Sequence, residues 1–466
     1  MKIKLADYAF MRQFGNYTYI VNTLSRKDIV FEDAEYFSKH IGREESDLKD
    51  VLSNLYEDFK DMDKATIRND FIEFLTSLHQ IGALCMDCET DIPDDVKEIN
   101  GRGVDDVLPS PRELLDSYFE KTRTLFALQI DVTPACTERC IHCYIPEYEA
   151  KFLPFWKIKE VIDEFTDMGG LIFILSGGEC MLHPDFCQIL QYARSKDLMI
   201  KVLSNLTLCT EKVMYVLKET TSEVQTSLYS MDAKIHDSIT KREGSWKETK
   251  NTIEGLRRIG LPCTISCPLM DVNQNDYPNV RKYALSIGAQ PQTDIMIIAK
   301  MNGDVKNLDC RISPKKIEEV LRYQTNTSLE QNKDYFVNYF QTDSKLMQKE
   351  RNEWLSRNLC SAGLSRICLD ANGNYFPCPG FSGFVLGNCF HESLKWVWNE
   401  STNIAKLRSI KGMNLKKCAS CQNRRYCSIC LCRNYNETGD MLIPPEYNCE
   451  VARINRKVLE GIKNAT

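Results

Sequence analysis

Hydrophobic positions between residues 125 and 300 follow two alternating patterns. Short apolar runs, typical of buried strands, are separated by amphipathic stretches in which apolar residues recur every three or four positions. The runs lie at 125–132, 171–175, 199–203, 224–228, 264–269 and 295–299. The amphipathic stretches lie at 157–168, 185–196, 212–219, 246–259 and 277–287. Strands that alternate with such helices form parallel βαβ units. The pattern therefore predicts an α/β fold with a partial (β/α)6 TIM-type barrel, whose functional residues follow the C-terminal ends of the strands.

The residues before the barrel have a different pattern. Two short β-rich runs precede two helical stretches, and these elements lie at 17–21, 28–31, 48–59 and 66–81. Asp63 is placed to be the N-cap of the second helix. A small sheet followed by helices predicts a winged-helix-like domain in residues 1–90, and a stretch rich in Asp, Gly and Pro predicts a linker over 91–120.

The rest of the chain divides into three predicted parts. Residues 121–304 contain the barrel pattern, residues 305–358 are polar and helical and form a predicted bridge, and residues 359–466 are rich in cysteine and loops. With 466 residues, the chain is long enough for two to four domains.

Composition limits the partners, the compartment and the kinds of metal site that we expect for this chain. The net charge is −6 and the basic residues are scattered, so we expect no nucleic-acid partner. The N-terminus lacks an apolar signal segment, and no apolar stretch reaches the roughly 18 residues of a membrane span, so we expect a cytoplasmic protein with no membrane partner. Thiols stay reduced in the cytoplasm. The 21 cysteines, against 6 histidines, therefore indicate thiolate metal sites, either iron–sulfur or zinc.

Three cysteines follow the first barrel strand at once. Cys136, Cys140 and Cys143 have the spacing C-x3-C-x2-C. Three thiolates this close can hold three irons of a cubane cluster, which leaves the fourth iron open for the amino and carboxylate groups of S-adenosylmethionine. The alternative is a zinc site with His142 or a distant residue as the fourth ligand.

Polar residues also end the next three predicted strands. The second strand leads into Gly177, Gly178 and Glu179, where the glycines allow a ligand close to the backbone and the carboxylate can accept a hydrogen bond from a methionyl amine. Ser204 and Asn205 end the third strand, and Ser227 lies near the end of the fourth. Each of these residues alone is an ordinary loop residue, but together they line up behind the three cysteines.

A second set of cysteines lies in the C-terminal part of the chain. Its members are Cys360, Cys368, Cys378, Cys418, Cys421, Cys427, Cys430, Cys432 and Cys449. Paired C-x2-C units let thiolates converge, so this array can hold two metal centres. Iron–sulfur clusters and zinc ribbons use similar spacings, and the spacing alone does not separate them.

Residues 125–300 resemble the core of the radical S-adenosylmethionine (SAM) superfamily. The three-cysteine loop and the Gly-Gly-Glu motif carry the resemblance, with His142 at the aromatic-type position before the last cysteine. The stretch 225–236 resembles the fourth strand of peptide-modifying members. The resemblance implies that S-adenosylmethionine binds near His142 and the polar residues at the strand ends, whereas no adenine-binding motif is recognisable in 264–269. It also implies an electron donor such as flavodoxin or ferredoxin.

Residues 360–449 resemble a SPASM domain, which holds two auxiliary [4Fe–4S] clusters. The resemblance assigns the first cluster to Cys360, Cys368, Cys378 and Cys430, and the second to Cys418, Cys421, Cys427 and Cys449. The pattern departs from the family at Leu431, where a cysteine is expected, and Cys430 is favoured over Cys432 as the replacement. Without Cys368, the first cluster would have an open iron.

Residues 1–88 resemble the PqqD-like peptide-recognition element of peptide maturases. In that family the leader of a precursor peptide adds a strand to the sheet edge. A packing or dimerisation domain and a DNA-binding winged helix are the alternatives, and acidic positions beside the 66–81 helix disfavour DNA.

The combined resemblance implies an enzyme that modifies a ribosomally made peptide, most consistently by forming thioether crosslinks of the ranthipeptide type. The alternatives are carbon–carbon crosslinking, epimerisation, cysteine or serine oxidation of the sulfatase type, and a non-catalytic, zinc-stabilised peptide-binding protein. No residue is identified as a catalytic acid or base.

The remaining cysteines are expected to be packing residues. Cys180, Cys187, Cys209, Cys263, Cys267, Cys310 and Cys389 lie in strand or helix contexts, where a free cysteine acts as a small hydrophobe. Cys85 and Cys88 form a C-x2-C with no second pair nearby and are interpreted as incidental.

Overall fold

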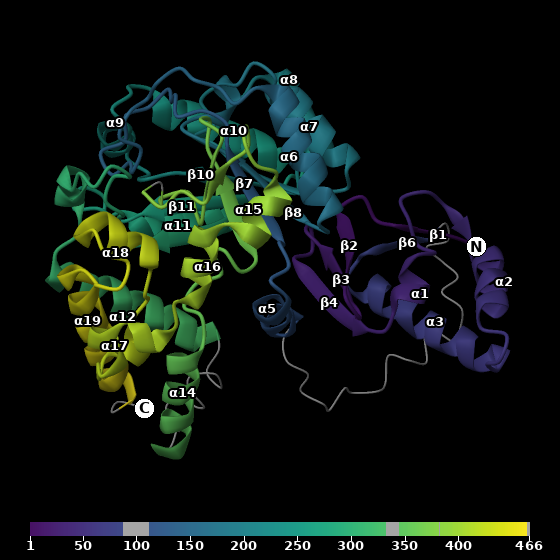
Figure 1. Ribbon diagram of the computed structural model, residues 1–466. Coiled ribbons are helices and arrows are strands. Elements are labelled where there is room, and N and C mark those ends of the chain that lie inside the picture. The colour runs from purple at the N-terminus through teal and green to yellow at the C-terminus, as the bar shows by residue number, and fades with distance from the viewer. Residues whose placement is uncertain (87–110, 332–343, 382, 464–466) are drawn as a thin grey trace.

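The structure is a computed structural model that describes residues 1–86, 111–331, 344–381 and 383–463. Its centre is a parallel sheet of six strands surrounded by helices (Figure 1). The strands are β7 (Ala127–Asp131), β8 (Ile172–Ser176), β9 (Met199–Leu203), β10 (Glu223–Ser227), β11 (Cys263–Pro268) and β12 (Gln290–Asp294). Each strand pairs in parallel with the next, which confirms the predicted α/β partial barrel.

Helices follow the strands as the periodicity predicts. They are α6 (Phe155–Asp167), α7 (Phe186–Ser195), α8 (Glu211–Thr220), α10 (Ser245–Arg258) and α11 (Tyr277–Ser286). The apolar face of α6 shows why they form: Ile158, Val161, Ile162 and Phe165 recur at helical spacing, and all are buried in the main core. A short helix, α9 (Ala233–Thr240), was not predicted, and Asp232 caps its N-terminus by accepting a hydrogen bond from the Lys234 amide.

The predicted position of the sixth strand, 295–299, is wrong. The strand is β12, which ends at Asp294 before that run begins. Within the described sheet β12 pairs only with β11, so its alternate residues Gln290, Gln292 and Asp294 stay exposed and its sequence is polar. The apolar run packs as irregular backbone instead, with Ile297 against the core beside the three-cysteine loop.

The sheet continues beyond the barrel into the C-terminal part of the chain. Strand β13 (Arg366–Leu369) pairs in parallel with β7, and β14 (Asn374–Phe376) and β15 (Gly387–Asn388) extend the sheet further as antiparallel strands. The strand order is β12-β11-β10-β9-β8-β7-β13-β14-β15. The first barrel strand is therefore covered on both edges.

The C-terminal part is otherwise helical and closes one side of the barrel. Its helices are α15 (Leu394–Glu400), α16 (Thr402–Ser409), α17 (Lys416–Ala419), α18 (Leu431–Thr438) and α19 (Glu446–Lys463). The bridge contains α12 (Pro314–Gln331) and α14 (Ser344–Ser356), and α12 packs along α19 (Figure 1). Both helices lie within residues 305–358, the predicted bridge.

The N-terminal part contains more strands than the sequence indicated. Strands β2 (Ala9–Phe14), β3 (Tyr17–Asn22) and β4 (Lys27–Glu32) form one antiparallel sheet, while β1 (Lys2–Leu5) lies between β5 (Ser46–Asp47) and β6 (Leu84–Met86). The helices are α1 (Glu35–Ser38), α2 (Leu48–Asp58) and α3 (Lys64–Gln80). Asp63 caps α3 as predicted, because its carboxylate accepts from the Thr66 amide at 3.0 Å. The winged-helix resemblance itself stays a prediction.

The N-terminal sheet docks on the barrel at the end where the strands begin. One face packs against the helix α5 (Pro111–Thr122) and against Phe126 and Leu171, which precede β7 and β8. Polar contacts converge on Asp197, just before β9. Its carboxylate accepts from Arg43 at 2.7 Å and Arg194 at 3.0 Å, and its carbonyl accepts from Arg12 at 3.1 Å.

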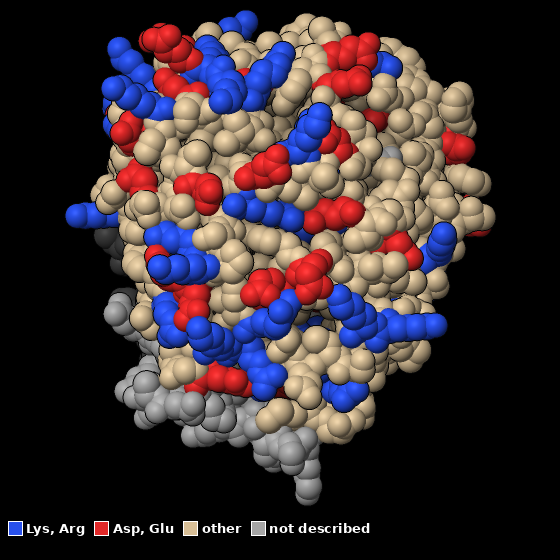
Figure 2. Space-filling view, turned by 90° about the vertical axis from the view of Figure 1, so that its left-hand side faces the viewer, with Lys and Arg blue, Asp and Glu red and all other residues tan. Residues whose placement is uncertain are grey.

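Charges of both signs are interspersed on the face that carries α9, α18 and α19 (Figure 2). No helix among the described residues is both long enough and apolar enough to cross a lipid bilayer.

A buried ion pair joins the barrel side to the C-terminal domain, and its loss should be costly. The Arg311 guanidinium forms two bonds with the Glu437 carboxylate at 2.5 and 3.0 Å, and both side chains are less than 10% exposed. Glu437→Ala leaves a buried cation unpaired, so we expect about 3–5 kcal/mol of destabilisation. Chemical denaturation of the metal-loaded protein measures it. Glu460→Ala removes the exposed Arg456–Glu460 pair and should cost under about 1 kcal/mol; equal effects would contradict the prediction.

Candidate active site

The backbone of the three-cysteine loop is held from two sides. On one side, the Gly178 amide donates to the Thr133 carbonyl at 2.7 Å and the Glu179 amide donates to the Ala135 carbonyl at 2.8 Å. On the other side, the Arg139 and Ile141 amides donate to the last carbonyls of α9, at 2.8 and 3.0 Å. The loop is thus clamped between the turn after β8 and the end of α9.

Gly177 and Gly178 are required by the close approach of this loop. Gly177 has φ +145°, and a Cβ there would lie 2.5 Å from the Thr133 carbonyl oxygen. A Cβ at Gly178 would lie 2.4 Å from the carbonyl oxygens of Pro134 and Ala135. The two glycines therefore let the second strand pack directly on the loop, which adds a structural role to the predicted ligand contact.

Cys136, Cys140 and Cys143 line a cavity of about 380 Å³ at the C-terminal ends of the strands. Burial raises the pKa of Cys136 to about 12, and the pKa of Cys140 is also raised, first by burial and then by Glu138 and Cys143. Buried thiols such as Cys136 and Cys140 resist ionisation unless a cation binds them. Their chemistry therefore fits an iron–sulfur centre, whose irons take thiolates and neutralise them.

Most of the residues predicted to bind the cofactor line this cavity. They are His142, Gly177, Gly178, Ser204, Asn205 and Ser227. Asn205 has the most contacts with the three-cysteine loop. Its side-chain Nδ2 donates to the Thr137 hydroxyl at 2.9 Å and to the Cys136 sulfur at 3.7 Å. His142 is neutral at physiological pH, since burial lowers its pKa to about 4. The structure thus brings the predicted set together around one cavity.

Glu179 lies behind the cavity wall. It is fully buried, and its carboxylate accepts from the Met181 amide at 2.9 Å, the Ser204 hydroxyl at 2.8 Å and the Asn205 amide at 2.8 Å. Burial raises its pKa while these bonds oppose the shift. In this geometry Glu179 orients Ser204 and Asn205, and its predicted bond to a methionyl amine stays a prediction.

The sequence did not point to the far wall of the cavity. Gln292 and Asp294 of β12, with Met296 and Ile298 beyond it, line that wall. The Asp294 side chain is exposed to the open cavity. The polar alternation of 290–294 is a signal for this strand, but the apolar run that follows it is the stronger strand pattern.

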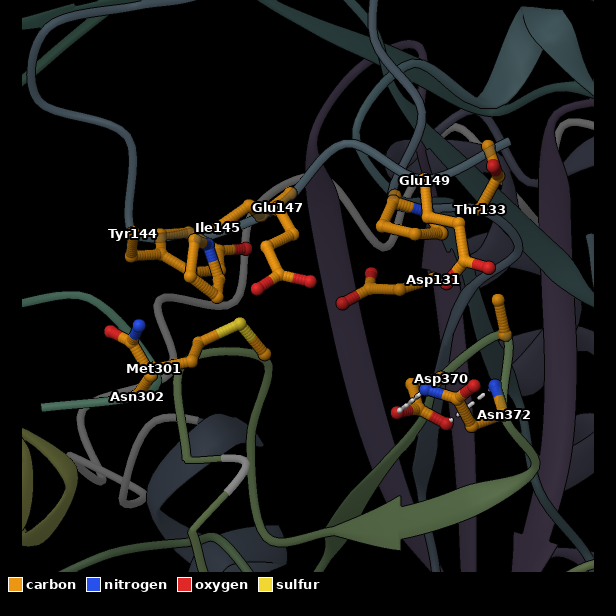
Figure 3. A pocket seen from close by; sticks show the side chains of 14 residues that line it. Asp131, Thr133, Tyr144, Ile145, Glu147, Glu149, Met301, Asn302, Asp370 and Asn372 are labelled. Atoms are coloured by element: carbon orange, nitrogen blue, oxygen red, sulfur yellow. Dashed lines mark hydrogen bonds between the residues drawn. The ribbon is translucent and has the colours of Figure 1, made fainter. Parts of the chain in front are cut away.

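A second pocket of about 280 Å³ adjoins the first and shares Tyr144, Ile145 and Gly177 with it. Four carboxylates line this pocket: Asp131, Glu147, Glu149 and Asp370. Figure 3 shows the first three around a common space, while Asp370 comes from the C-terminal part of the chain, in the turn after β13. Burial raises the pKa of Asp131 to about 6. The pocket forms an acidic vestibule between the loop after Cys143 and the turn between β13 and β14.

The C-terminal thiols form two groups. In the first, Cys432 lies close to Cys378 and Cys430, and the pKa of Cys360 is raised first by burial and then by the same two thiols. In the second, the pKa of Cys418 is raised first by burial and then by Cys427, Cys449 and Cys421. The second group has the four members that the resemblance implies.

Cys368 is directed toward a different partner. It lies on β13, fully buried, and its thiol donates to the Asp131 carboxylate at 3.7 Å. Cys378 still influences it electrostatically, so it remains at the margin of the first group. The structure therefore places Cys432 among the first-group thiols and Cys368 beside them.

Among the described residues, no three His, Cys, Asp or Glu side chains converge on one point closely enough to hold a single metal ion. The remaining cysteines agree with the packing interpretation, since Cys180, Cys263, Cys267 and Cys389 are buried. Cys85 is exposed, and Cys88 lies outside the described residues.

Comparison with known families identifies both halves of this arrangement. Residues 130–284 match the Radical SAM superfamily, and residues 360–423 match SPASM, an iron–sulfur cluster-binding domain. The chain therefore contains a radical SAM domain and a SPASM domain. The cofactors of this radical SAM/SPASM enzyme are S-adenosylmethionine and [4Fe–4S] clusters, in the barrel and in the SPASM domain, which the two thiol regions fit.

The proteins that this radical SAM/SPASM enzyme resembles are named for different activities. An AdoMet-dependent heme synthase from Methanosarcina barkeri is 25% identical over 68% of this chain and 94% of its own length. The antilisterial bacteriocin subtilosin biosynthesis protein AlbA from Bacillus subtilis is 26% identical over 58% of each chain. Among solved structures, Streptococcus suis SuiB bound to the precursor peptide SuiA has a TM-score of 0.60 and 15% identity, covering 94% of this chain and 97% of that one. The similarity to SuiB shows the same fold along nearly the whole chain.

The contacts of Cys432 make its role testable. If Cys432 completes the first auxiliary centre, Cys432→Ala should lower the iron content from about twelve toward about eight per chain, whereas Cys368→Ala should retain it. Iron analysis and electron paramagnetic resonance (EPR) of anaerobically reconstituted protein measure both. Cys389→Ala, a buried cysteine of the same domain outside the two groups, is the matched control. Loss of iron in Cys368→Ala alone would instead support the ligand set implied by family resemblance.

Proposed function

We propose that this enzyme modifies a ribosomally made precursor peptide, forming a thioether between a cysteine sulfur and a carbon of the peptide. The observation that carries the proposal is the position of the cavity: the three thiols face it, and it opens into the acidic vestibule between the barrel and the SPASM domain. This space fits a peptide segment reaching the cofactor. Bound at the three-thiol loop, the cluster and S-adenosylmethionine supply a 5′-deoxyadenosyl radical that abstracts hydrogen.

The residues of the chain have defined roles in this proposal. Cys136, Cys140 and Cys143 hold the barrel cluster, and Asn205 and Ser204 present polar groups to the cofactor under the control of Glu179. The SPASM domain extends the barrel sheet through β13, which pairs with β7. The C-terminal thiols would hold the auxiliary clusters, whose chemistry would be electron acceptance or binding of a substrate thiolate.

Similarity to the relatives supports a peptide substrate. AlbA is named for the biosynthesis of a bacteriocin, and SuiB was solved with a precursor peptide. Neither name states which bond is formed. These similarities therefore support a peptide substrate, and the thioether is a more specific proposal. Carbon–carbon crosslinking, epimerisation and sulfatase-type oxidation are the alternatives for the same site.

A heme-synthase function is the second candidate, because relatives with that name match 66–68% of this chain. The fold of SuiB, in contrast, extends over 94% of the chain and so includes most of the N-terminal region. A peptide-binding N-terminal domain explains this additional part, and for that reason the peptide substrate is favoured.

The N-terminal domain offers an edge for the leader of such a peptide. Strand β4 pairs only with β3 among the described residues, and Phe31 of β4 packs on Phe74 of α3 with ring centroids 4.8 Å apart. An added strand would gain backbone hydrogen bonds along β4 and side-chain contacts near these rings. We infer that the leader binds here and that flavodoxin or ferredoxin supplies the electron.

Replacement of Cys136, Cys140 and Cys143 together by alanine tests the reaction class. We expect 5′-deoxyadenosine formation to be abolished and the iron content to fall by about four per chain, since the three thiolates hold one cluster. Chromatography of anaerobic reactions and iron analysis measure the two quantities. The triple replacement of Cys187, Cys209 and Cys310 by alanine is the control. Persistent 5′-deoxyadenosine in the first variant would refute the assignment.

The product is tested by co-expression with each small open reading frame beside the gene, followed by mass spectrometry. A thioether lowers the peptide mass by two hydrogens, about 2 Da per crosslink, and blocks alkylation of one cysteine per crosslink. A mass loss with the cysteine still alkylatable would indicate a carbon–carbon crosslink, and an unchanged mass with altered stereochemistry would indicate epimerisation. A consumed porphyrin precursor would favour the heme-synthase candidate.

Leader binding should depend on β4. Phe31→Ala removes an aromatic contact beside the proposed added strand, so we expect the affinity for a fluorescent leader peptide to fall about tenfold, by roughly 1–1.5 kcal/mol. Fluorescence anisotropy with the peptide found by co-expression measures it. Tyr36→Ala is the matched control, because Tyr36 is an exposed aromatic residue of the same domain on α1, packed on Phe59. A similar loss in both variants would argue against binding at the β4 edge.

A further inference from the structure

Tyr229 lies directly beside the barrel thiols and has no role in the function described so far. It follows β10 by two residues, and its side chain is almost completely buried in a small cluster with Ile297 and Met270. Its hydroxyl donates to the Cys140 sulfur at 3.8 Å. Tyr229 therefore presents a hydroxyl to a cluster ligand inside the protein.

The packing around Tyr229 fixes this direction. Its ring lies between His142, at 5.2 Å between centroids, and His236, at 5.3 Å. Its amide donates to His236 Nδ1 at 3.2 Å, and its carbonyl accepts from the Asn273 side chain at 2.9 Å. With backbone and ring both constrained, the hydroxyl has little freedom to turn away from Cys140.

A second tyrosine lies beside the barrel thiols. Tyr148 lines the same cavity as Cys143, with its hydroxyl near the Cys143 sulfur. The Arg139 guanidinium stacks over the Tyr148 ring at 4.1 Å from its centroid, which holds the ring against the loop. Two of the three barrel thiols thus each have a tyrosine hydroxyl as a neighbour.

The tyrosine contacts differ from the other polar contact at Cys140. The Cys140 sulfur also lies 3.4 Å from Glu138, but there the thiol is the donor. A metal-bound cysteine is a thiolate and cannot donate, so that bond requires a proton that cluster binding removes. A tyrosine hydroxyl is itself a donor and can donate when the sulfur becomes a thiolate.

Hydrogen bonds to the sulfurs of an iron–sulfur cluster influence its reduction potential. Reduction adds one electron and makes the centre more negative, and a donor stabilises the more negative state to a greater extent. We propose that Tyr229 and Tyr148 raise the reduction potential of the barrel cluster by donating hydrogen bonds to the Cys140 and Cys143 thiolates. This inference rests on the proposed function, because it requires the cluster to be bound by these thiols.

The electron balance is simple. One electron passes from a low-potential donor protein, such as flavodoxin or ferredoxin, to the barrel centre, and the donor is oxidised by one electron. The tyrosines form and break no covalent bond and lose no proton. They are positioning residues that make this transfer more favourable for a donor of given potential.

Tyr229→Phe removes the hydroxyl and keeps the ring between the two histidines. We expect the midpoint potential of the barrel cluster to become more negative, with about a threefold lower equilibrium constant for one-electron reduction, or about 30 mV. Tyr148→Phe should shift it in the same direction. Redox titration followed by EPR measures the midpoint, and the signal that changes on addition of S-adenosylmethionine identifies the barrel cluster.

Tyr192→Phe is the matched control, because it removes a tyrosine hydroxyl bonded at 2.7 Å to Asp163 on the outer helices of the barrel. Its midpoint should equal that of the unmodified protein. An S-adenosylmethionine-sensitive signal with unchanged midpoints in both Tyr229→Phe and Tyr148→Phe would overturn the inference and leave the proposed function intact. Absence of such a signal in the unmodified protein would instead refute the proposed function. If Tyr229→Phe fails to load iron, the Tyr148→Phe midpoint decides.

Discussion

Parallel pairing of β7 with a strand on each side is the constraint on which the site depends. On one side β8 leads into the two glycines that press on the cysteine loop, and on the other side β13 carries Cys368 beside Asp131. The loop that holds the barrel thiols and the region that holds the first group of SPASM thiols are therefore connected through one short strand. A change in the register of β7 would move both sites, and the glycines would no longer face the loop carbonyls.

The acidic side chains of the site differ in how deeply they are buried, and this difference determines what each of them contacts. Glu179 is buried and fully bonded, so it fixes the ends of β8 and β9. Asp294 faces the cavity, and Asp131 lies beneath the vestibule (Figure 3). The three carboxylates thus have different roles. Glu179 holds the strand ends in place, Asp294 lines the cavity, and Asp131 accepts a hydrogen bond from the Cys368 thiol.

The parts of the site that follow from local sequence could be predicted, and the parts that depend on tertiary contacts could not. The three cysteines and Gly177–Gly178 follow a strand directly, so spacing and strand order located them. Strand β12 was misplaced because an edge strand facing a cavity is polar. Two further features join residues that are far apart in the chain: the pairing of β13 with β7, and the proximity of Cys432 to Cys378. Hydrophobic periodicity reports only local structure, so it does not predict either feature. Tyr229 appeared as part of a family-like stretch, but only the fold brings its hydroxyl to Cys140.

The docking of the N-terminal sheet at Asp197 has a geometric consequence for any peptide held there. That contact lies where the barrel strands begin, whereas the thiols lie where they end, so a bound chain must pass along the height of the barrel. A five-residue strand such as β7 spans about 17 Å, and an extended chain covers roughly 3.3 Å per residue. A peptide anchored on the N-terminal sheet, as proposed, would therefore need at least about five extended residues beyond the anchored segment to reach the three thiols.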